Sequence, residues 1–334
     1  MIAVRTVWVV LLTLLCLSSR AQGSESANKP FELEIGVDEK YDDLAVYVVD
    51  QTAGTVSKKG DLLTEPYFTL SHRFPGRFPT RLILDVTADF YAKYSIQNYQ
   101  TYKLSVIQRI ASKTYLTAKY TFIPDIFFGD DVVDIPPGTA PLPTKDQSYR
   151  IHIFQVTADR DFTRNLNLAI SGRYGIRDAR PAFNYRDMTL WSGALDGTYW
   201  LTRDTRLGLG TSYEKDNARG GFNLFLSTPM NPIRDDATYN QFSLYTSLTY
   251  LISEAWSLRG GYTHRERFYI TKFAGDTLHN GRTDHTNSIL LSTTYRLTDP
   301  IGLKASYEGI WRDSTKSYAR FHENIYTVGV NYHF

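Results

Sequence analysis

Cysteine is almost absent from this sequence of 334 residues. The single one, Cys16, lies in an apolar stretch near the amino terminus, so the rest of the chain has neither a disulfide nor a thiolate site. A strong charge of one sign is also lacking, because a net charge of +2 gives none of the basic excess that nucleic-acid binding needs. The mean hydropathy of −0.32 excludes a bundle of membrane-spanning helices, but it allows a barrel of strands with a polar inner face and polar loops.

Motifs for nucleotide binding and for catalysis are missing as well. The sequence has neither a Walker loop nor a dinucleotide fingerprint. His279, His285 and Ser288 are close in sequence, but a serine hydrolase also needs a group that positions the base and an oxyanion site, and neither has a motif here. The histidines are better explained as loop or strand-end residues, so we predict no enzyme activity and no cofactor.

Metal-binding patterns are weak. Three acidic pairs, Asp42–Asp43, Asp130–Asp131 and Asp235–Asp236, fall in stretches where we expect long loops. A carboxylate pair can hold a divalent cation, but no calcium-loop spacing surrounds these pairs. Solvated loop charges are therefore the favoured interpretation, and we predict no metal site.

Residues 1–21 have the layout of a secretory signal peptide. Arg5 supplies the positive start, Val7 to Leu17 form the apolar core, and the small residues Ser19 and Ala21 precede the expected cleavage site. A membrane anchor helix is the alternative, but the apolar run is too short to span a bilayer. Residues 22–30 are then a polar run-in within the periplasm.

The last stretch, His322 to Phe334, alternates strictly between two kinds of side chain. Tyr326, Val328, Val330, Tyr332 and Phe334 share one face, so the stretch is a β-strand with one apolar side. The chain stops there, and an uncapped apolar strand at a sheet edge invites aggregation, whereas a closed barrel leaves no edge. Alternation with a terminal Phe resembles the carboxy-terminal signature of bacterial outer-membrane proteins, in which Tyr332 and Phe334 would be read by the barrel-assembly machinery.

The residues from 31 to 334 divide into about fourteen segments of the length that crosses an outer membrane. We predict strands at 31–40, 64–73, 80–94, 100–109, 114–124, 147–160, 165–178, 187–201, 205–215, 238–251, 256–269, 285–297, 301–313 and 322–334. Every second connection is a tight turn, and the others are mostly long, Tyr41–Leu63 among them. Short periplasmic turns alternating with long extracellular loops predict an all-β fold, a transmembrane antiparallel up-and-down β-barrel.

One face of the clearer strands is an apolar band with aromatic residues near its ends, and the other face is polar and often charged. Strand 147–160 is ambiguous, because it carries apolar side chains on both faces. A barrel of fourteen strands is wide enough for a narrow lumen, and strands one to three lean acidic while strands eleven to thirteen lean basic. The predicted lumen-lining charges are Asp85, Asp89, Arg173, Arg206, Glu214, Arg259, Arg265, Arg296, Lys304, Glu308 and Arg312.

Two short stretches carry a family resemblance. Gly60 to Pro66 (GDLLTEP) opens a strand after the long first loop, and Asp313-Ser314, Tyr318 and Glu323-Asn324 precede the last strand. Together they resemble β-barrel porins of the "porin 2" type, many of which are encoded with exopolysaccharide or other envelope machinery. The tail is also similar to the barrel part of surface-lipoprotein assembly modifiers, whose helical repeat domain this chain lacks.

Three functions remain open from the sequence. The first is an outer-membrane porin or export channel for small polar solutes, anionic or glycan-like ones included. The second is a plugged or gated barrel that serves as a scaffold or secretion component, since charges that pair across the lumen would close it. The third and least favoured is a membrane enzyme. Each places the chain in the outer membrane of a Gram-negative bacterium, with lipid and lipopolysaccharide, the barrel-assembly machinery and envelope or exopolysaccharide-export proteins as expected partners.

Overall fold

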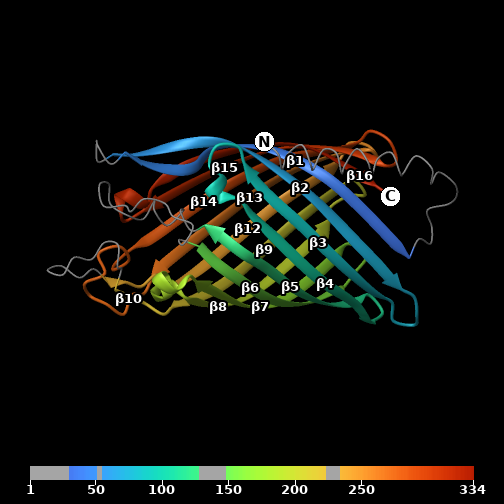
Figure 1. Ribbon diagram of the computed structural model, residues 1–334. Helices are drawn as coiled ribbons and strands as arrows, with labels where there is room; N and C mark the ends of the chain where they lie inside the picture. The colour runs from blue at the N-terminus through green and yellow to red at the C-terminus, as the bar shows by residue number, and fades with distance from the viewer. Residues whose placement is uncertain (1–29, 51–54, 128–147, 223–233) are drawn as a thin grey trace.

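A computed structural model of the chain describes residues 30–50, 55–127, 148–222 and 234–334 (Figure 1). The predicted signal peptide at 1–21, nearly all of the run-in at 22–30 and the pair Asp130–Asp131 lie outside these residues. No helix in the described part of the chain is both long and apolar enough to cross a bilayer.

Fourteen antiparallel strands form one closed barrel, which confirms the predicted fold class and strand number. Neighbours in the barrel are also neighbours in sequence, except that β9 pairs with β12 and β1 pairs with β16 to close the ring. The strands are β1 Phe31–Asp50, β2 Thr55–Phe74, β3 Thr80–Tyr91, β4 Tyr99–Ala111, β5 Thr114–Phe127, β6 Ser148–Asp161, β7 Leu166–Ala179, β8 Met188–Trp200, β9 Thr205–Ala218, β12 Tyr239–Leu251, β13 Trp256–Tyr269, β14 Thr283–Arg296, β15 Ile301–Ser314 and β16 Phe321–His333.

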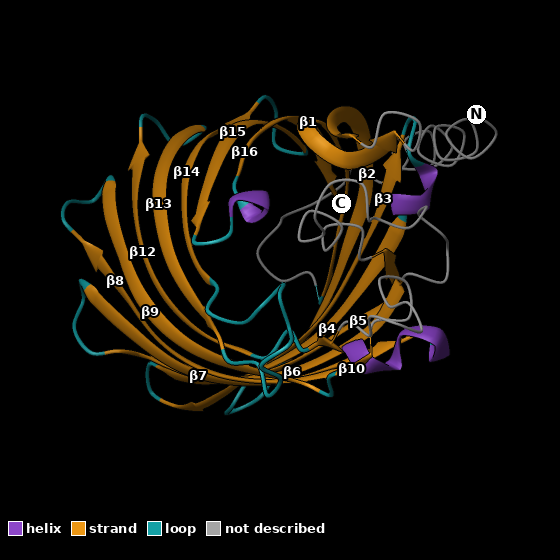
Figure 2. Ribbon diagram, turned by 90° about the vertical axis from the view of Figure 1, so that its left-hand side faces the viewer, coloured by secondary structure: helices purple, strands orange, loops and turns teal. Residues whose placement is uncertain are grey.

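The connections divide the barrel into two different ends (Figure 1). The predicted tight turns all lie at the end that also holds the carboxy terminus, here called the short-turn end. The long-loop end carries the short 3₁₀ segments η1 Ser95–Gln97, η3 Pro181–Arg186 and η4 Ser317–Ala319, and the two-stranded sheet of β10 Gly221–Phe222 with β11 Arg234–Asp235. Figure 2 shows the ring of strands end-on, with these loops in front.

The outer face of the barrel is apolar, as the alternation predicts. Ile170 and Val328 are 63% and 61% exposed although both are fully aliphatic, which suits contact with lipid rather than water. Phe154 and Val156 of β6 are also exposed, so the outer face of the ambiguous strand is the one that carries these two residues. Exposed aromatic residues lie near both ends of the band, among them Trp256, Tyr295, Tyr199 and Tyr250 at the short-turn end and Trp191, Tyr213 and Phe268 at the long-loop end.

The predicted long loop Tyr41–Leu63 is wrong. β1 and β2 continue as a hairpin to Asp50 and Thr55, with a β-bulge between Asp42 and Val46. The prediction ended β1 at Lys40, but cross-strand backbone pairing continues to Asp42 and resumes at Val46 after the bulge. The other twelve predicted strands begin and end within three residues of the observed ones.

The carboxylates of the first acidic pair take part in this hairpin. The backbone N–H of Leu44 donates to Asp42 Oδ1 at 2.7 Å, and the backbone N–H and side-chain amide of Asn324 donate to the Asp43 carboxylate at 2.7 and 2.6 Å. Asp43 therefore joins β1 to β16 across the closing seam. The interpretation of Asp42–Asp43 as solvated loop charges was wrong.

The two faces of a strand should respond differently to the same charged side chain. We expect Leu195→Arg on the outer face of β8 to lower the free energy of unfolding by about 2–4 kcal/mol, because the guanidinium must enter the lipid. The adjacent Ala194→Arg points to the inner face and should cost much less. Equilibrium denaturation of both variants in lipid vesicles checks this, and equal losses would contradict the assignment of the faces.

The closing seam can be tested by cross-linking. Val37 of β1 lies directly opposite Val330 of β16, so we expect cysteines at these two positions to form a disulfide in a chain that begins at Gln22, which has no other cysteine. Cysteines at Val37 and Leu303 should not cross-link, because Leu303 pairs with the far side of Val330 and is one strand too distant. Non-reducing mass spectrometry of the folded protein distinguishes the two, and cross-linking of the control pair alone would refute the β1–β16 register.

Candidate channel lumen

The predicted lumen charges share one face of the barrel wall. Cross-strand partners lie on the same side of a sheet, and so does every second residue of a strand. The registers therefore place these residues on the same face as Asp38, Gln241 and Arg267, opposite the exposed apolar side chains. The inner face therefore holds all eleven: Asp85, Asp89, Arg173, Arg206, Glu214, Arg259, Arg265, Arg296, Lys304, Glu308 and Arg312. Their role in a pore stays a prediction.

The acidic part of the inner wall, on β1 and β2, is largely neutralised by salt bridges. Asp38 is buried and lies 2.5 Å from Lys304 Nζ, across the closing seam. Glu65 pairs with Lys40 at 2.8 Å. Glu32, nearer the short-turn end, pairs with an arginine of β3 at 2.7 Å. Three carboxylates of the first two strands are therefore matched by cations.

The basic part, on β9 and β13, is paired less completely. Arg206 and Arg259 lie on either side of Thr249 in one row across β9, β12 and β13. Arg265 lies on the same face of β13, further toward the long-loop end. All three side chains are exposed, and none has an ion-pair partner in the part of the chain that the structure describes. These three arginines therefore add unpaired positive charge to the described inner wall.

A cavity of ≈ 420 Å³ lies at the short-turn end of the barrel. The inner-face side chains of Asp38, Tyr67, Lys304 and Asn331 line it, together with the turns that join β12 to β13 and β14 to β15. Tyr67 donates a hydrogen bond to Glu34 at 3.3 Å, and the Asn331 amide donates to the same carboxylate at 2.8 Å. This end of the interior thus has space for water and small polar molecules, lined by polar side chains.

At the long-loop end the inner wall is crowded by paired charges. Arg173 forms an ion pair with Glu214, and the Tyr239 hydroxyl donates to the same carboxylate at 2.9 Å. Arg177 lies 3.6 Å from the buried Asp216. These contacts connect β7, β9 and β12 along one part of the inner wall and not across the lumen.

The loop between β13 and β14 folds against this wall and is held by Asp276. The backbone N–H groups of Leu278 and His279 donate to Asp276 Oδ1 at 3.1 and 3.0 Å, and that of Asp236 donates to Oδ2 at 2.9 Å. The His279 ring stacks on Tyr269 at 5.0 Å, and its Nδ1 lies 3.1 Å from Asp276 Oδ2. A single carboxylate thereby joins two long loops.

Burial by itself would raise the pKa of the Asp276 carboxyl. The hydrogen bond and positive charge of His279, together with the backbone N–H groups, outweigh burial and lower the pKa below its usual value. The carboxylate is therefore ionised at neutral pH. Because the pKa of Asp276 is lower in the folded state than in the unfolded state, its ionised carboxylate stabilises the fold at pH values above the ordinary aspartate pKa. This stabilisation is lost as the pH falls through the lowered pKa.

The interpretation of Asp235–Asp236 as solvated charges is also wrong. Both side chains are buried. Arg186 donates to Asp235 at 3.0 Å, while Asp236 accepts from the backbone N–H groups of Lys272 and Thr238 at 2.9 and 3.1 Å. The two carboxylates therefore stabilise the folded loops, and the buried charge is compensated by these donors.

A small cavity of ≈ 50 Å³ lies where the loops meet the wall. It is lined by Arg177, Tyr239 and Arg267 from the strands and by Leu278 and His279 from the loop. The loops therefore occupy part of the interior along β7 to β13 at this end. The sequence analysis did not identify Asp276 as the residue that holds these loops, because an isolated loop aspartate has no motif.

The residues that suggested an enzyme are divided between different surfaces. His279 is buried in the loop, Ser288 is buried on the inner face of β14, and His285 is about half exposed on the outer face of the same strand. A base and a nucleophile on opposite faces of one strand cannot form a catalytic pair.

No protein-family model and no curated protein matches this sequence, so neither family resemblance is confirmed. Solved structures are similar in fold. A mutant of the monoaromatic hydrocarbon channel TodX is 10% identical with a TM-score of 0.50, over 92% of this chain and 91% of that one. A Pseudomonas aeruginosa FadL homologue is 12% identical with a TM-score of 0.49, over 91% and 90%. A bacterial polysaccharide outer membrane secretin is 11% identical with a TM-score of 0.48, over 91% and 98%. At these identities the likeness to the TodX mutant supports the barrel fold alone.

Proposed function

We propose that this protein is an outer-membrane channel that conducts small polar solutes and favours anions. The supporting observation is a group of exposed arginines on the inner wall. Arg206, Arg259 and Arg265 have no ion-pair partners in the described ranges, whereas Asp38, Glu65 and Glu32 are held in salt bridges. Unpaired cations along a wet wall attract anions and repel cations.

The charged interior favours polar solutes over apolar ones. The similar TodX structure is titled a hydrocarbon channel, but its 10% identity leaves the solute of this chain open. An apolar solute would displace the hydration of the inner arginines without replacing it. We therefore propose anionic or glycan-like solutes, with no catalytic step and no cofactor.

The proposed location is the outer membrane of a Gram-negative bacterium. Its support is the apolar outer face with aromatic residues near both ends, which is typical of strand barrels that span a bilayer. The proposed route is export directed by residues 1–21, followed by insertion through the barrel-assembly machinery with Tyr332 and Phe334 as the signal. The short-turn end would then face the periplasm and the long loops the exterior, in contact with lipopolysaccharide.

A gated or plugged barrel is the second candidate. The observation in its favour is the loop cluster around Asp276, which narrows the interior at the long-loop end. In that case, partners such as exopolysaccharide-export proteins would open or fill the lumen. The two candidates differ in whether the barrel alone conducts.

Charge selectivity tests the first candidate. We expect the purified barrel in planar bilayers to conduct, and its reversal potential in a salt gradient to show preference for the anion. The double variant Arg206→Gln, Arg259→Gln should shift that potential toward cations, because it removes two unpaired charges from one row.

The control is Lys215→Gln, which removes the same sign of charge from the outer face of β9. It should leave the reversal potential unchanged. A folded, inserted barrel that carries no current at any voltage would contradict the channel and favour the plugged scaffold. Selectivity that is unaffected by the double variant would contradict the role of the two arginines.

The role of Asp276 in holding the loop between β13 and β14 is tested by Asp276→Ala. Loss of the carboxylate leaves the backbone N–H groups of Asp236, Leu278 and His279 without their acceptor, so the loop should open more often. We expect trypsin to cleave after the buried Arg282 about tenfold faster than in the wild type, as followed by mass spectrometry. Asp299→Ala, in an exposed short turn, is the matched control and should have no effect. Equal cleavage rates in all three proteins would show that Asp276 does not hold the loop.

A further inference from the structure

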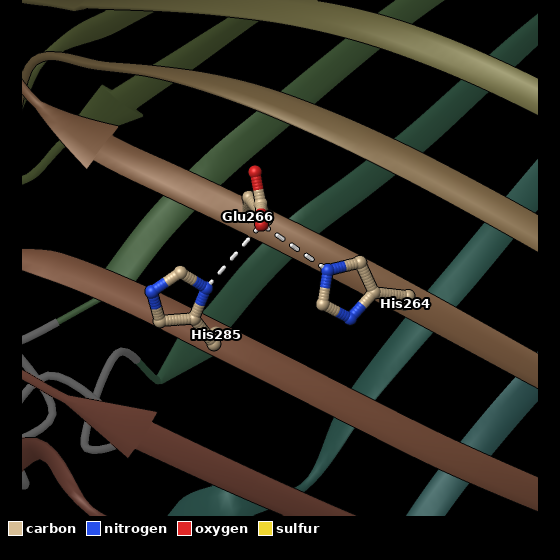
Figure 3. A group of neighbouring side chains, drawn as sticks. All are labelled: His264, Glu266 and His285. Atoms are coloured by element: carbon tan, nitrogen blue, oxygen red, sulfur yellow. Dashed lines mark hydrogen bonds and ion pairs between the residues drawn. The ribbon is translucent and has the colours of Figure 1, made fainter.

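A polar patch interrupts the apolar outer face of the barrel. It consists of His264 and Glu266 on β13 and His285 on β14 (Figure 3). The registers place Glu266 directly between Phe242 and His285, and Ile289 and Leu291 continue the outer face of β14. Ionisable side chains on a lipid-facing surface are costly, so a group of three calls for a compensating interaction.

The three side chains converge on one point. Glu266 Oε1 lies 3.4 Å from His264 Nε2 and 3.5 Å from His285 Nδ1, and the three ligand atoms all lie within 4.8 Å of one another (Figure 3). A charge-assisted hydrogen bond would bring nitrogen and oxygen to about 2.7–2.9 Å. Zinc bonds of about 2.0–2.1 Å in tetrahedral geometry instead separate neighbouring ligand atoms by about 3.4 Å. The two distances from Glu266 are closer to the second arrangement.

A neighbouring residue orients one of the imidazoles. His264 Nδ1 lies 2.9 Å from Asn287 Oδ1, which also accepts a hydrogen bond from the Tyr262 hydroxyl at 2.7 Å. Because this oxygen can only accept, the proton of a neutral His264 belongs on Nδ1. The lone pair of Nε2 then points toward Glu266, and two acceptors face each other with no proton between them. Such support from outside the ligand set is typical of histidines that bind metals.

We propose that His264, Glu266 and His285 form a site for a divalent transition-metal ion of the zinc type. Two imidazoles and one carboxylate are a donor set that suits zinc, copper or nickel rather than calcium or magnesium, which prefer oxygen ligands alone. The ligands come from adjacent strands, so the ion would join β13 to β14. The register between the two strands brings these ligands together. The sequence analysis predicted no metal site, because this register cannot be read from the sequence.

The site lies where water can reach the ion. Trp311 stands opposite Asn287 on β15, in the part of the outer face that approaches the long-loop end. The side chains of His264, Glu266 and His285 are 29%, 36% and 46% exposed, so a remaining coordination position is open to water. Asp313 lies opposite His285 and places a second carboxylate beside the site. The site is therefore distinct from the inner wall and from the proposed channel.

Calorimetric titration of the folded barrel with Zn²⁺, in detergent and without a polyhistidine tag, tests the proposal. We expect one high-affinity Zn²⁺ per chain, and intense visible absorption of tetrahedral type when Co²⁺ takes its place. His264→Gln, Glu266→Gln and His285→Gln should each weaken binding by at least about tenfold, and Asn287→Leu should weaken it by about tenfold through His264.

The matched control is His322→Gln. His322 stacks on Trp311 on the outer face but belongs to neither strand of the site, so this variant should bind Zn²⁺ as the wild type does. Circular dichroism verifies that each variant is folded, and a rise in the Tm of the wild type with Zn²⁺ gives a second readout that needs no variant. Absence of binding up to about 1 mM Zn²⁺ would overturn the proposal. Equal affinity in the wild type and in all three ligand variants would overturn it as well.

Discussion

The structure depends on the pairing of β1 with β16. A strand in lipid has no water to satisfy its N–H and C=O groups, so every strand needs a neighbour on both sides, and only a closed ring provides this. The register from Glu34–His333 to Asp42–Ile325 closes the ring between residues almost 300 positions apart. Side chains on both faces reinforce it: Lys304 and Asp38 meet on the inside, and Asp43 binds Asn324 beyond the apolar band. Once the ring is closed, alternate residues of every strand are divided between lipid and lumen.

This division decides what the interior can do. On the inner wall the distribution of partners matters more than the number of charges. Asp38, Glu65 and Glu32 of β1 and β2 are matched by lysines and an arginine, whereas three arginines of β9 and β13 are exposed and unmatched among the described residues. The long-loop end carries a different arrangement, in which buried aspartates accept hydrogen bonds from the backbone of loops that fold against the inner wall. A polar cavity at the short-turn end and a cluster of anchored loops at the long-loop end are the structural basis of both functional candidates.

The outer face of the barrel is apolar where the inner face is charged, so a group of polar residues on the outer face is informative. Lipid contact selects aliphatic side chains along the band and aromatic ones near its ends. His264, Glu266 and His285 break this rule together, at one place and on adjacent strands. Isolated polar residues near an interface need no special account, but three potential ligands that converge within a few ångströms support the proposed metal site. The inner and outer faces of β13 thus carry separate chemistry: Arg259 and Arg265 toward the lumen, and the proposed metal ligands toward the exterior.

The sequence by itself determined the class of fold, the number of strands and most of their bounds, because period-two alternation and turn chemistry are local properties. The eleven lumen charges fall on one face for the same reason. Tertiary structure alone decided which charges meet. Asp235, Asp236 and Asp276 are buried because backbone donors of distant loops reach them, and β1 and β2 extend past Lys40 because cross-strand pairing resumes beyond a bulge. His264, Glu266 and His285 come together only through the β13–β14 register. Contacts of this kind depend on how far one strand is shifted against the next, and no local pattern of residues encodes that shift.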